Sequence, residues 1–210
     1  MIIKELEVGP IMANCFILGC EKTGEAVVVD PGDDADKILA LLAESKLKVK
    51  YLINTHGHFD HVSANKRMKK VTGADLLIHT LDAPMLDQLS QNAAMFGLTS
   101  ENSPKPDRML EDGDTITFGD NIIIKVLHTP GHTLGGISLV VDDIVIVGDT
   151  LFAGSIGRTD LPGGSFDVLS SSIKKKLFTL DDNTKVLTGH GPATTIGNEK
   201  RSNPFVGAGR

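Results

Sequence analysis

The sequence has little cysteine, which excludes a scaffold stabilised by disulfides. Only two cysteines, Cys15 and Cys20, occur among the 210 residues. A chain of this length can bury a sizeable core and needs no disulfide to stabilise it. The two positions lie five apart in an apolar stretch, so alternation along a strand would place them on opposite faces. We therefore expect reduced, buried thiols in a cytoplasmic protein.

Export and membrane segments are also missing, and positive charge is scarce. Residues 1–7 lack the basic segment and apolar stretch of a signal peptide, and no run of about 18 apolar residues occurs. Twenty-seven acidic residues against 21 basic ones leave a net charge of −6, which opposes binding to a phosphate backbone. The sequence thus predicts neither a membrane span nor a nucleic-acid partner, and it says nothing of oligomeric state.

What the sequence does contain is typical of an ordinary globular chain, with 40% apolar and 23% charged residues. Its 22 glycines recur between short β-branched runs, as at junctions between strands and turns. The runs predict strands at 2–7, 14–19, 25–30, 49–54, 76–79, repeatedly within 115–149, and at 185–187. Helices are predicted after residue 33, near 62–71 and 81–89, and over 167–178, and a flexible loop over 90–107. This order indicates two similar halves, each with a sheet and outer helices.

A cluster of histidines follows the strand predicted at 49–54. His56, His58 and His61 fall within six residues, with Asp60 among them. On a loop that closes a strand, His56 and His58 project to the same side, whereas Asp60 and His61 point elsewhere. One short segment can therefore serve two neighbouring metal ions.

Two such ions need further donors from distant parts of the chain, because a zinc-like ion takes about four to five ligands and a catalytic site leaves one position for water. His132, Asp149 and His190 each follow an apolar strand and a glycine, which places a donor at an open sheet edge. We expect these residues to complete a site for two divalent metal ions. A donor set without cysteine suits zinc, our first expectation, and also iron or manganese.

Three further residues have open interpretations. Asp30 ends an apolar strand, where its carboxylate either caps the next turn or orients a metal-bound imidazole through the free N–H of the ring. His79 and His128 each end an apolar strand as well, and we expect structural roles or contacts to metal ligands for them.

The histidine cluster and the later donors together carry a family resemblance. The relevant segments are Thr55-His56-Gly57-His58-Phe59-Asp60-His61, Pro130-Gly131-His132, Gly148-Asp149 and Gly189-His190. They resemble the full metal-binding set of the metallo-β-lactamase-fold superfamily. The resemblance implies an α+β fold, a four-layer αββα sandwich that spans 1–210 as a single domain, with the site at one edge of its two sheets.

The resemblance also implies which residues hold each metal. In such proteins the counterparts of His56, His58 and His132 hold the first ion, and those of Asp60, His61 and His190 hold the second. The counterpart of Asp149 bridges both ions.

Within the superfamily, the chain is similar to short, single-domain glyoxalase II-like hydrolases, on the segments 148–152, 154–160 and 189–192. Only 20 residues follow His190, so we expect no C-terminal helical domain for binding glutathione. The lactamases proper usually lack a histidine at the position of His61 and often use a cysteine ligand, so antibiotic hydrolysis is not expected.

The activity implied is that of a thioesterase acting on small molecules such as S-D-lactoylglutathione. A hydroxide shared by the two metals attacks the thioester carbonyl, and Asp60 both binds a metal and accepts a hydrogen bond from this hydroxide. For Arg158, two roles are equally open: holding a substrate carboxylate, or an internal pair with Asp160.

A persulfide dioxygenase with one iron is the alternative within the same fold, because that branch also carries a Gly-Arg-Thr-Asp element like residues 157–160. The Gly191-Pro192 pair after His190 favours the hydrolase, since the dioxygenase branch has an acidic and an aromatic residue there.

Overall fold

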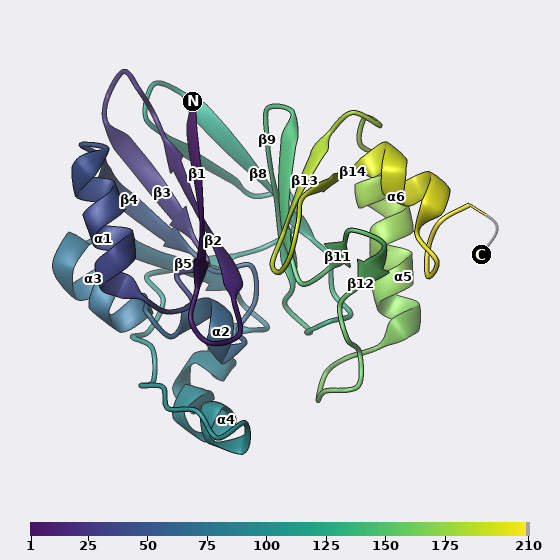
Figure 1. Ribbon diagram of the computed structural model, residues 1–210, viewed down its shortest axis with the longest axis horizontal. Coiled ribbons are helices and arrows are strands. Elements are labelled where there is room, and N and C mark those ends of the chain that lie inside the picture. Colours follow the sequence, from purple (N-terminus) through teal and green to yellow (C-terminus); the bar gives the residue numbers. More distant parts are fainter. Residues whose placement is uncertain (209–210) are drawn as a thin grey trace.

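Two six-stranded β-sheets pack face to face in the computed structural model, which describes residues 1–208 (Figure 1). The first sheet has the order β1-β2-β3-β4-β5-β6, with strands Ile2–Val8, Ala13–Gly19, Glu25–Val29, Lys48–Ile53, Asp75–His79 and Arg108–Leu110. The second has the order β14-β13-β10-β9-β8-β7, with strands Thr194–Thr195, Lys185–Thr188, Ile144–Gly148, Ile137–Val141, Ile122–His128 and Thr115–Phe118. A separate hairpin pairs β11 (Leu151–Phe152) with β12 (Ser155–Ile156).

Helices cover the outer face of each sheet. Helices α1 (Ala35–Glu44) and α3 (Asn65–Thr72) lie against the first sheet, and α5 (Phe166–Lys175) and α6 (Ile196–Ser202) lie against the second (Figure 1). The short elements are α2 (Phe59–Val62), the 3₁₀-helices η1 (Ala83–Gln88) and η2 (Leu177–Thr179), and α4 (Leu89–Met95). The layers therefore form the predicted four-layer αββα sandwich. No helix within residues 1–208 is long and apolar enough to cross a membrane.

The apolar strands are explained by burial on both faces. In β2, Phe16 and Leu18 pack between the two sheets, whereas Cys15 and Ile17 face the helices of the first half. A strand covered on both sides is apolar throughout rather than alternating. Cys20, just after β2, joins the core between the sheets, so the two free cysteines lie on opposite faces as predicted.

The prediction of a flexible loop over 90–107 is wrong for the first part of this segment, because helix α4 occupies residues 89–95. Leu89 and Ala93, four residues apart, are fully buried and form its apolar face. The ring of Phe96, at its end, lies 5.6 Å from the ring of Phe59. Helix α4 projects beyond α2, at the lower end of the molecule in Figure 1.

Backbone hydrogen bonds join loops of the two sheets at the edge where β4, β10 and β13 end. Asn14 donates its N–H to the carbonyl of Gly189 (2.7 Å), and Gly189 donates to Gly148 (2.8 Å). On the other side, Ile137 of β9 donates to Thr55 (2.8 Å). The loops after β10 and β13 are thereby held against each other, and the loops after β4 and β13 are each held against a strand of the opposite sheet.

Candidate metal centre

All seven predicted donors meet at this edge of the sheets. They come from the loop after β4, from α2, and from the residues that follow β8, β10 and β13: His56, His58, Asp60, His61, His132, Asp149 and His190. One group with the geometry to hold a metal ion consists of His56, His58 and His132, whose donor atoms lie within 4.8 Å of one another. A second consists of Asp60, His61 and His190.

Hydrogen bonds pointing away from the cluster determine which ring nitrogen each histidine presents. His132 Nδ1 lies 2.8 Å from the carbonyl oxygen of Arg158, and His190 Nδ1 lies 3.2 Å from that of Met12. A carbonyl oxygen only accepts, so these Nδ1 atoms carry the hydrogen. Both rings therefore turn the free electron pair of Nε2 toward the cluster.

Asp30 orients two further buried imidazole rings, that of His61 directly and that of His56 through Thr55. Its carboxylate lies 3.1 Å from His61 Nδ1 and accepts hydrogen bonds from the N–H (2.7 Å) and the hydroxyl (2.6 Å) of Thr55. The hydroxyl of Thr55 gives its hydrogen to Asp30, so it accepts from His56 Nδ1 at 3.1 Å. Asp30, His56 and His61 could by distance hold an ion themselves, but these bonds already occupy the carboxylate. Of the two interpretations of Asp30, the contacts favour orientation of imidazole rings.

Asp149 lies between the two groups. Its Oδ1 is 3.3 Å from His61 Nε2, and its Oδ2 is 3.6 Å from His132 Nε2 and 3.7 Å from His190 Nε2. One carboxylate therefore faces a histidine of the first group and two of the second. This is the position that a bridging ligand requires.

Two glycines make room for this carboxylate. Gly148 has a φ of 50°, in the left-handed region that favours glycine, and a Cβ there would collide with the hydroxyl of Thr55. A Cβ on Gly189 would collide with Asp149 Oδ1. Both residues allow the ends of β10 and β13 to approach closely.

The spacing of the donor atoms and their missing hydrogen-bond partners are explained better by bound metal ions than by direct contacts between the donors. His56 Nε2 and Asp149 Oδ1 are buried without a hydrogen-bond partner. His61 Nε2 and His190 Nε2 face each other at 3.1 Å, and His58 Nδ1 and His132 Nε2 at 2.9 Å. Two nitrogens on one tetrahedral zinc are about 3.3 Å apart, from bond lengths of about 2.0–2.1 Å. Unpartnered buried donors and converging nitrogens are thus the expected pattern of a metal site.

The first group is electrostatically ready for a cation. Burial, together with the neighbouring His61, holds the pKa of His56 well below its ordinary value. Burial and His132 lower the pKa of His58 to about 4. His56 and His58 are therefore neutral near pH 7, which is the form that binds a metal.

The second group instead attracts protons. Burial opposes the charged form of His61, but Asp149 and Asp60 outweigh burial and raise its pKa well above the ordinary value. Burial likewise opposes the charge of His190, and its hydrogen bond to Asp60 and the nearby Asp149 raise its pKa. Burial would raise the pKa of Asp60 and Asp149, but the adjacent His61 outweighs it and lowers both. Protons on His61 and His190 therefore balance the negative charge of Asp60 and Asp149, a role that bound metal cations would take over.

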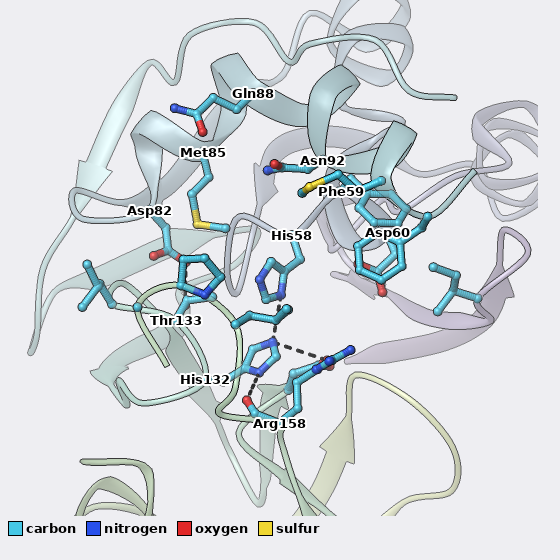
Figure 2. Close-up of a pocket in the computed structure, with 18 of the residues that line it drawn as sticks. His58, Phe59, Asp60, Asp82, Met85, Gln88, Asn92, His132, Thr133 and Arg158 are labelled. Atoms are coloured by element: carbon cyan, nitrogen blue, oxygen red, sulfur yellow. Dashed lines mark hydrogen bonds and ion pairs between the residues drawn. The ribbon is translucent and has the colours of Figure 1, made fainter. Parts of the chain in front are cut away.

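A cavity of about 670 Å³ opens beside the donors, and His58, Asp60, His132, Asp149 and His190 form part of its lining. Figure 2 shows Met85, Gln88 and Asn92 on one side of His58 and Arg158 beyond His132. The guanidinium of Arg158 forms two hydrogen bonds with Asp160, at 2.8 and 2.7 Å. Of the two roles open for Arg158, the structure contains the internal pair.

Asp82 is a buried residue of the site that sequence reasoning missed. Its carboxylate accepts hydrogen bonds from the N–H of Gly57 (3.0 Å), the hydroxyl of Thr133 (2.7 Å) and the N–H of Gly135 (2.6 Å). Gly57 lies between His56 and His58, and Thr133 follows His132. Asp82 therefore joins the two loops that carry the first group of donors.

His79 and His128, for which structural roles or contacts to ligands were expected, stack on each other with ring centroids 4.1 Å apart. His79 Nδ1 accepts from the N–H of Leu81 (3.2 Å), and His128 Nε2 donates to the carbonyl of Leu134 (2.9 Å). These contacts are structural and lie outside the donor groups.

Comparison with known proteins places the chain in a family. The model of the metallo-beta-lactamase superfamily matches residues 8–190, and the chain belongs to that superfamily. An uncharacterized protein of Aquifex aeolicus is 41% identical, with 99% of this chain and 98% of that protein covered. The hydroxyacylglutathione hydrolase GloC of Haemophilus influenzae is 37% identical, with 98% of each chain covered. The probable metallo-hydrolase YqgX of Bacillus subtilis is 36% identical, with 97% and 96% covered. The chain is therefore a member of a metallo-hydrolase superfamily.

Solved structures agree with this assignment. BLEG-1, a B3 metallo-beta-lactamase, superimposes with a TM-score of 0.91 at 34% identity, covering 98% of this chain and 99% of that one. TTHA1623, solved in a di-iron-bound form, has a TM-score of 0.89 at 37% identity, with 96% and 99% covered. ETHE1 from Myxococcus xanthus has a TM-score of 0.82 at 31% identity, with 98% and 85% covered. The fold is therefore shared with a metallo-beta-lactamase, so overall shape alone does not assign a substrate.

Proposed function

We propose that this protein is a hydrolase that uses two divalent metal ions to cleave thioesters, with S-D-lactoylglutathione as the first substrate to assay. The observation that carries the proposal is the convergence of seven nitrogen and oxygen donors in two groups joined by Asp149. Seven donors exceed what one catalytic zinc needs. The similarity to the hydroxyacylglutathione hydrolase of Haemophilus influenzae supports the choice of a thioester.

In this proposal, His56, His58 and His132 hold one ion, Asp60, His61 and His190 hold the other, and Asp149 contacts both. When bound, such a pair supplies water with a pKa lowered toward about 7 and polarises a carbonyl oxygen. Zinc suits the donors, and iron, the metal of the TTHA1623 structure, suits them equally.

Asp60 is the residue that we assign to handling the water nucleophile. Its side chain is 16% exposed and lines the cavity, with Oδ2 3.3 Å from His190 Nε2. The adjacent His61 and His190 keep its pKa low despite burial, so it is an anion near neutral pH. A carboxylate in this state accepts a hydrogen bond from the attacking water and keeps it oriented toward the carbonyl carbon.

Within the described residues, the cavity lining offers no free hydroxyl or thiol to act as a nucleophile instead. The hydroxyl of Thr133 is bound to Asp82, and both cysteines lie in the cores. Attack by water on the thioester and release of the thiol therefore require no covalent intermediate on the protein.

The test combines metal quantification, on protein purified without added metal, with assays of three substrates. Two metal equivalents and metal-dependent cleavage of S-D-lactoylglutathione are expected. Oxygen consumption with glutathione persulfide and a single iron would instead support the persulfide dioxygenase, the alternative activity on the same fold. Faster cleavage of a β-lactam than of any thioester would support a lactamase, as the likeness to BLEG-1 allows.

A further inference from the structure

The cavity beside the donors has a wall that the proposed hydrolysis of a short hydroxyacyl group does not use. Its volume of about 670 Å³ is typical of sites for small molecules and is much larger than a lactoyl group requires. The wall is built from Phe59 of α2, from η1 and α4, and from the segments that follow His132 and Arg158. Its large apolar side chains include Phe59, Met85, Met95, Phe96, Leu134 and Leu161.

Several of these apolar side chains are exposed to solvent. Met95 is 76% exposed, Leu134 57% and Phe96 51%. Exposed apolar side chains gathered around one cavity are costly to hydrate and mark a place where an apolar ligand is bound. The two methionines have flexible, unbranched side chains that adapt to chains of different length.

The charges of the cavity do not match the remote part of a glutathione thioester, which carries two carboxylates. Of the lining residues in the described chain, Arg158 alone has a permanent positive charge, and Asp160 already binds its guanidinium through two hydrogen bonds. Gln88 and Asn92, the polar residues contributed by η1 and α4, are neutral. A charged thiol half therefore gains little by entering the cavity.

We propose that the cavity holds an apolar acyl chain, so that the preferred substrates are thioesters of medium-length fatty acids. With the thioester carbonyl at the donors and the polar thiol half in solvent, the acyl chain extends along the wall formed by Met85, Met95 and Phe96. The inference rests on the proposed thioester hydrolysis and names its substrate class.

A series of acyl thioesters of one neutral thiol tests this inference. Acetyl, lactoyl, butanoyl, hexanoyl and octanoyl thioesters of N-acetylcysteamine keep the leaving group constant, and the protein is assayed with both metals bound. The value of kcat/KM should rise about fourfold for each methylene that the cavity buries, which corresponds to about 0.8 kcal/mol per methylene. A flat or falling series would overturn the inference. A second series consists of acetyl thioesters of alkyl thiols of increasing length. A rise in kcat/KM that appears only in this second series would also overturn the inference.

A pair of matched variants locates the effect. Met95→Gln makes the wall polar at nearly constant size, and should lower kcat/KM for the octanoyl thioester at least several-fold more than for the acetyl thioester. Met109→Gln makes the same change at a residue of β6 that is 47% exposed and lies outside the cavity lining, and should leave both values unchanged. Equal losses for both substrates in Met95→Gln would contradict a role in chain binding.

Failure of this inference is distinguishable from failure of the proposed function. Cleavage of acetyl and lactoyl thioesters without any dependence on chain length would refute the apolar specificity and leave the hydrolase standing. No cleavage of any thioester by protein with two metals bound would refute both.

Discussion

Replacing Asp149 by alanine should remove both metal ions, whereas replacing His190 should remove mainly one. Asp149 faces His132 of the first group at 3.6 Å and both His61 (3.3 Å) and His190 (3.7 Å) of the second. A bridging carboxylate offsets the repulsion between two adjacent cations, so its loss weakens both sites. A terminal imidazole serves one ion only.

The expected size of the effect can be compared with the contribution to metal affinity of residues that hydrogen-bond to a ligand without binding the metal. Loss of a residue that merely orients a ligand typically weakens metal binding about 10- to 100-fold. Loss of a direct ligand should exceed this range, so we expect Asp149→Ala to weaken both sites more than about 100-fold, or about 2.8 kcal/mol each. In His190→Ala, only the site of Asp60 and His61 should weaken to this extent.

Isothermal titration of metal-stripped protein with zinc measures both affinities in one experiment. Asp143→Ala, an exposed aspartate at the opposite end of β10, serves as the matched control and should bind like the wild type. Circular dichroism of each stripped variant verifies that it has folded. If folded Asp149→Ala retains one site at wild-type affinity, Asp149 does not bridge the two ions.

Three further results are expected. Lowering the pH from about 8 to about 6 should weaken metal binding at the site of His61 and His190 before it weakens the site of His56, His58 and His132. Nearby carboxylates raise the pKa of the His61 and His190 rings, and each ring must lose its proton to bind a metal. Equal losses of affinity at the two sites in metal titrations would contradict this expectation. Asp82→Asn should lower the free energy of unfolding of the metal-free protein by about 1–3 kcal/mol, since the NH2 group of asparagine would replace one of the two accepting oxygens and would face a backbone N–H donor. An unchanged urea midpoint would show that these hydrogen bonds are dispensable. Arg158→Ala should change kcat/KM for glutathione thioesters and for neutral thioesters by the same factor, because the guanidinium of Arg158 already binds Asp160. A loss of transition-state stabilisation of about 1.5–3 kcal/mol that is confined to glutathione thioesters would place Arg158 on a substrate carboxylate.

The positions of four donors could be predicted from the sequence because each of them follows an apolar strand and lies beside a glycine. Such a pattern is local, and the ends of neighbouring strands necessarily meet at a sheet edge. His56, His132, Asp149 and His190 are all of this kind. The alternation of strands and helices likewise predicted two sheets with outer helices, because each half buries its own apolar faces.

Features that depend on long-range contacts could not be predicted in this way. Nothing near Asp82 in the sequence marks its role, because its partners Gly57, Thr133 and Gly135 come from two other loops. Helix α4 lies in a polar segment with weak periodicity, and its burial depends on contacts such as that between Phe59 and Phe96. The apolar wall of the cavity depends on α4 and was therefore missed as well.

Thioester hydrolysis measured as metal is added back to stripped protein tests the central claim most directly. The account requires both donor groups to be filled, so activity should remain low up to one equivalent of zinc or iron and rise to its maximum at two. Full thioesterase activity at one equivalent, or oxygen uptake with glutathione persulfide at one equivalent of iron and no hydrolysis at two, would contradict it.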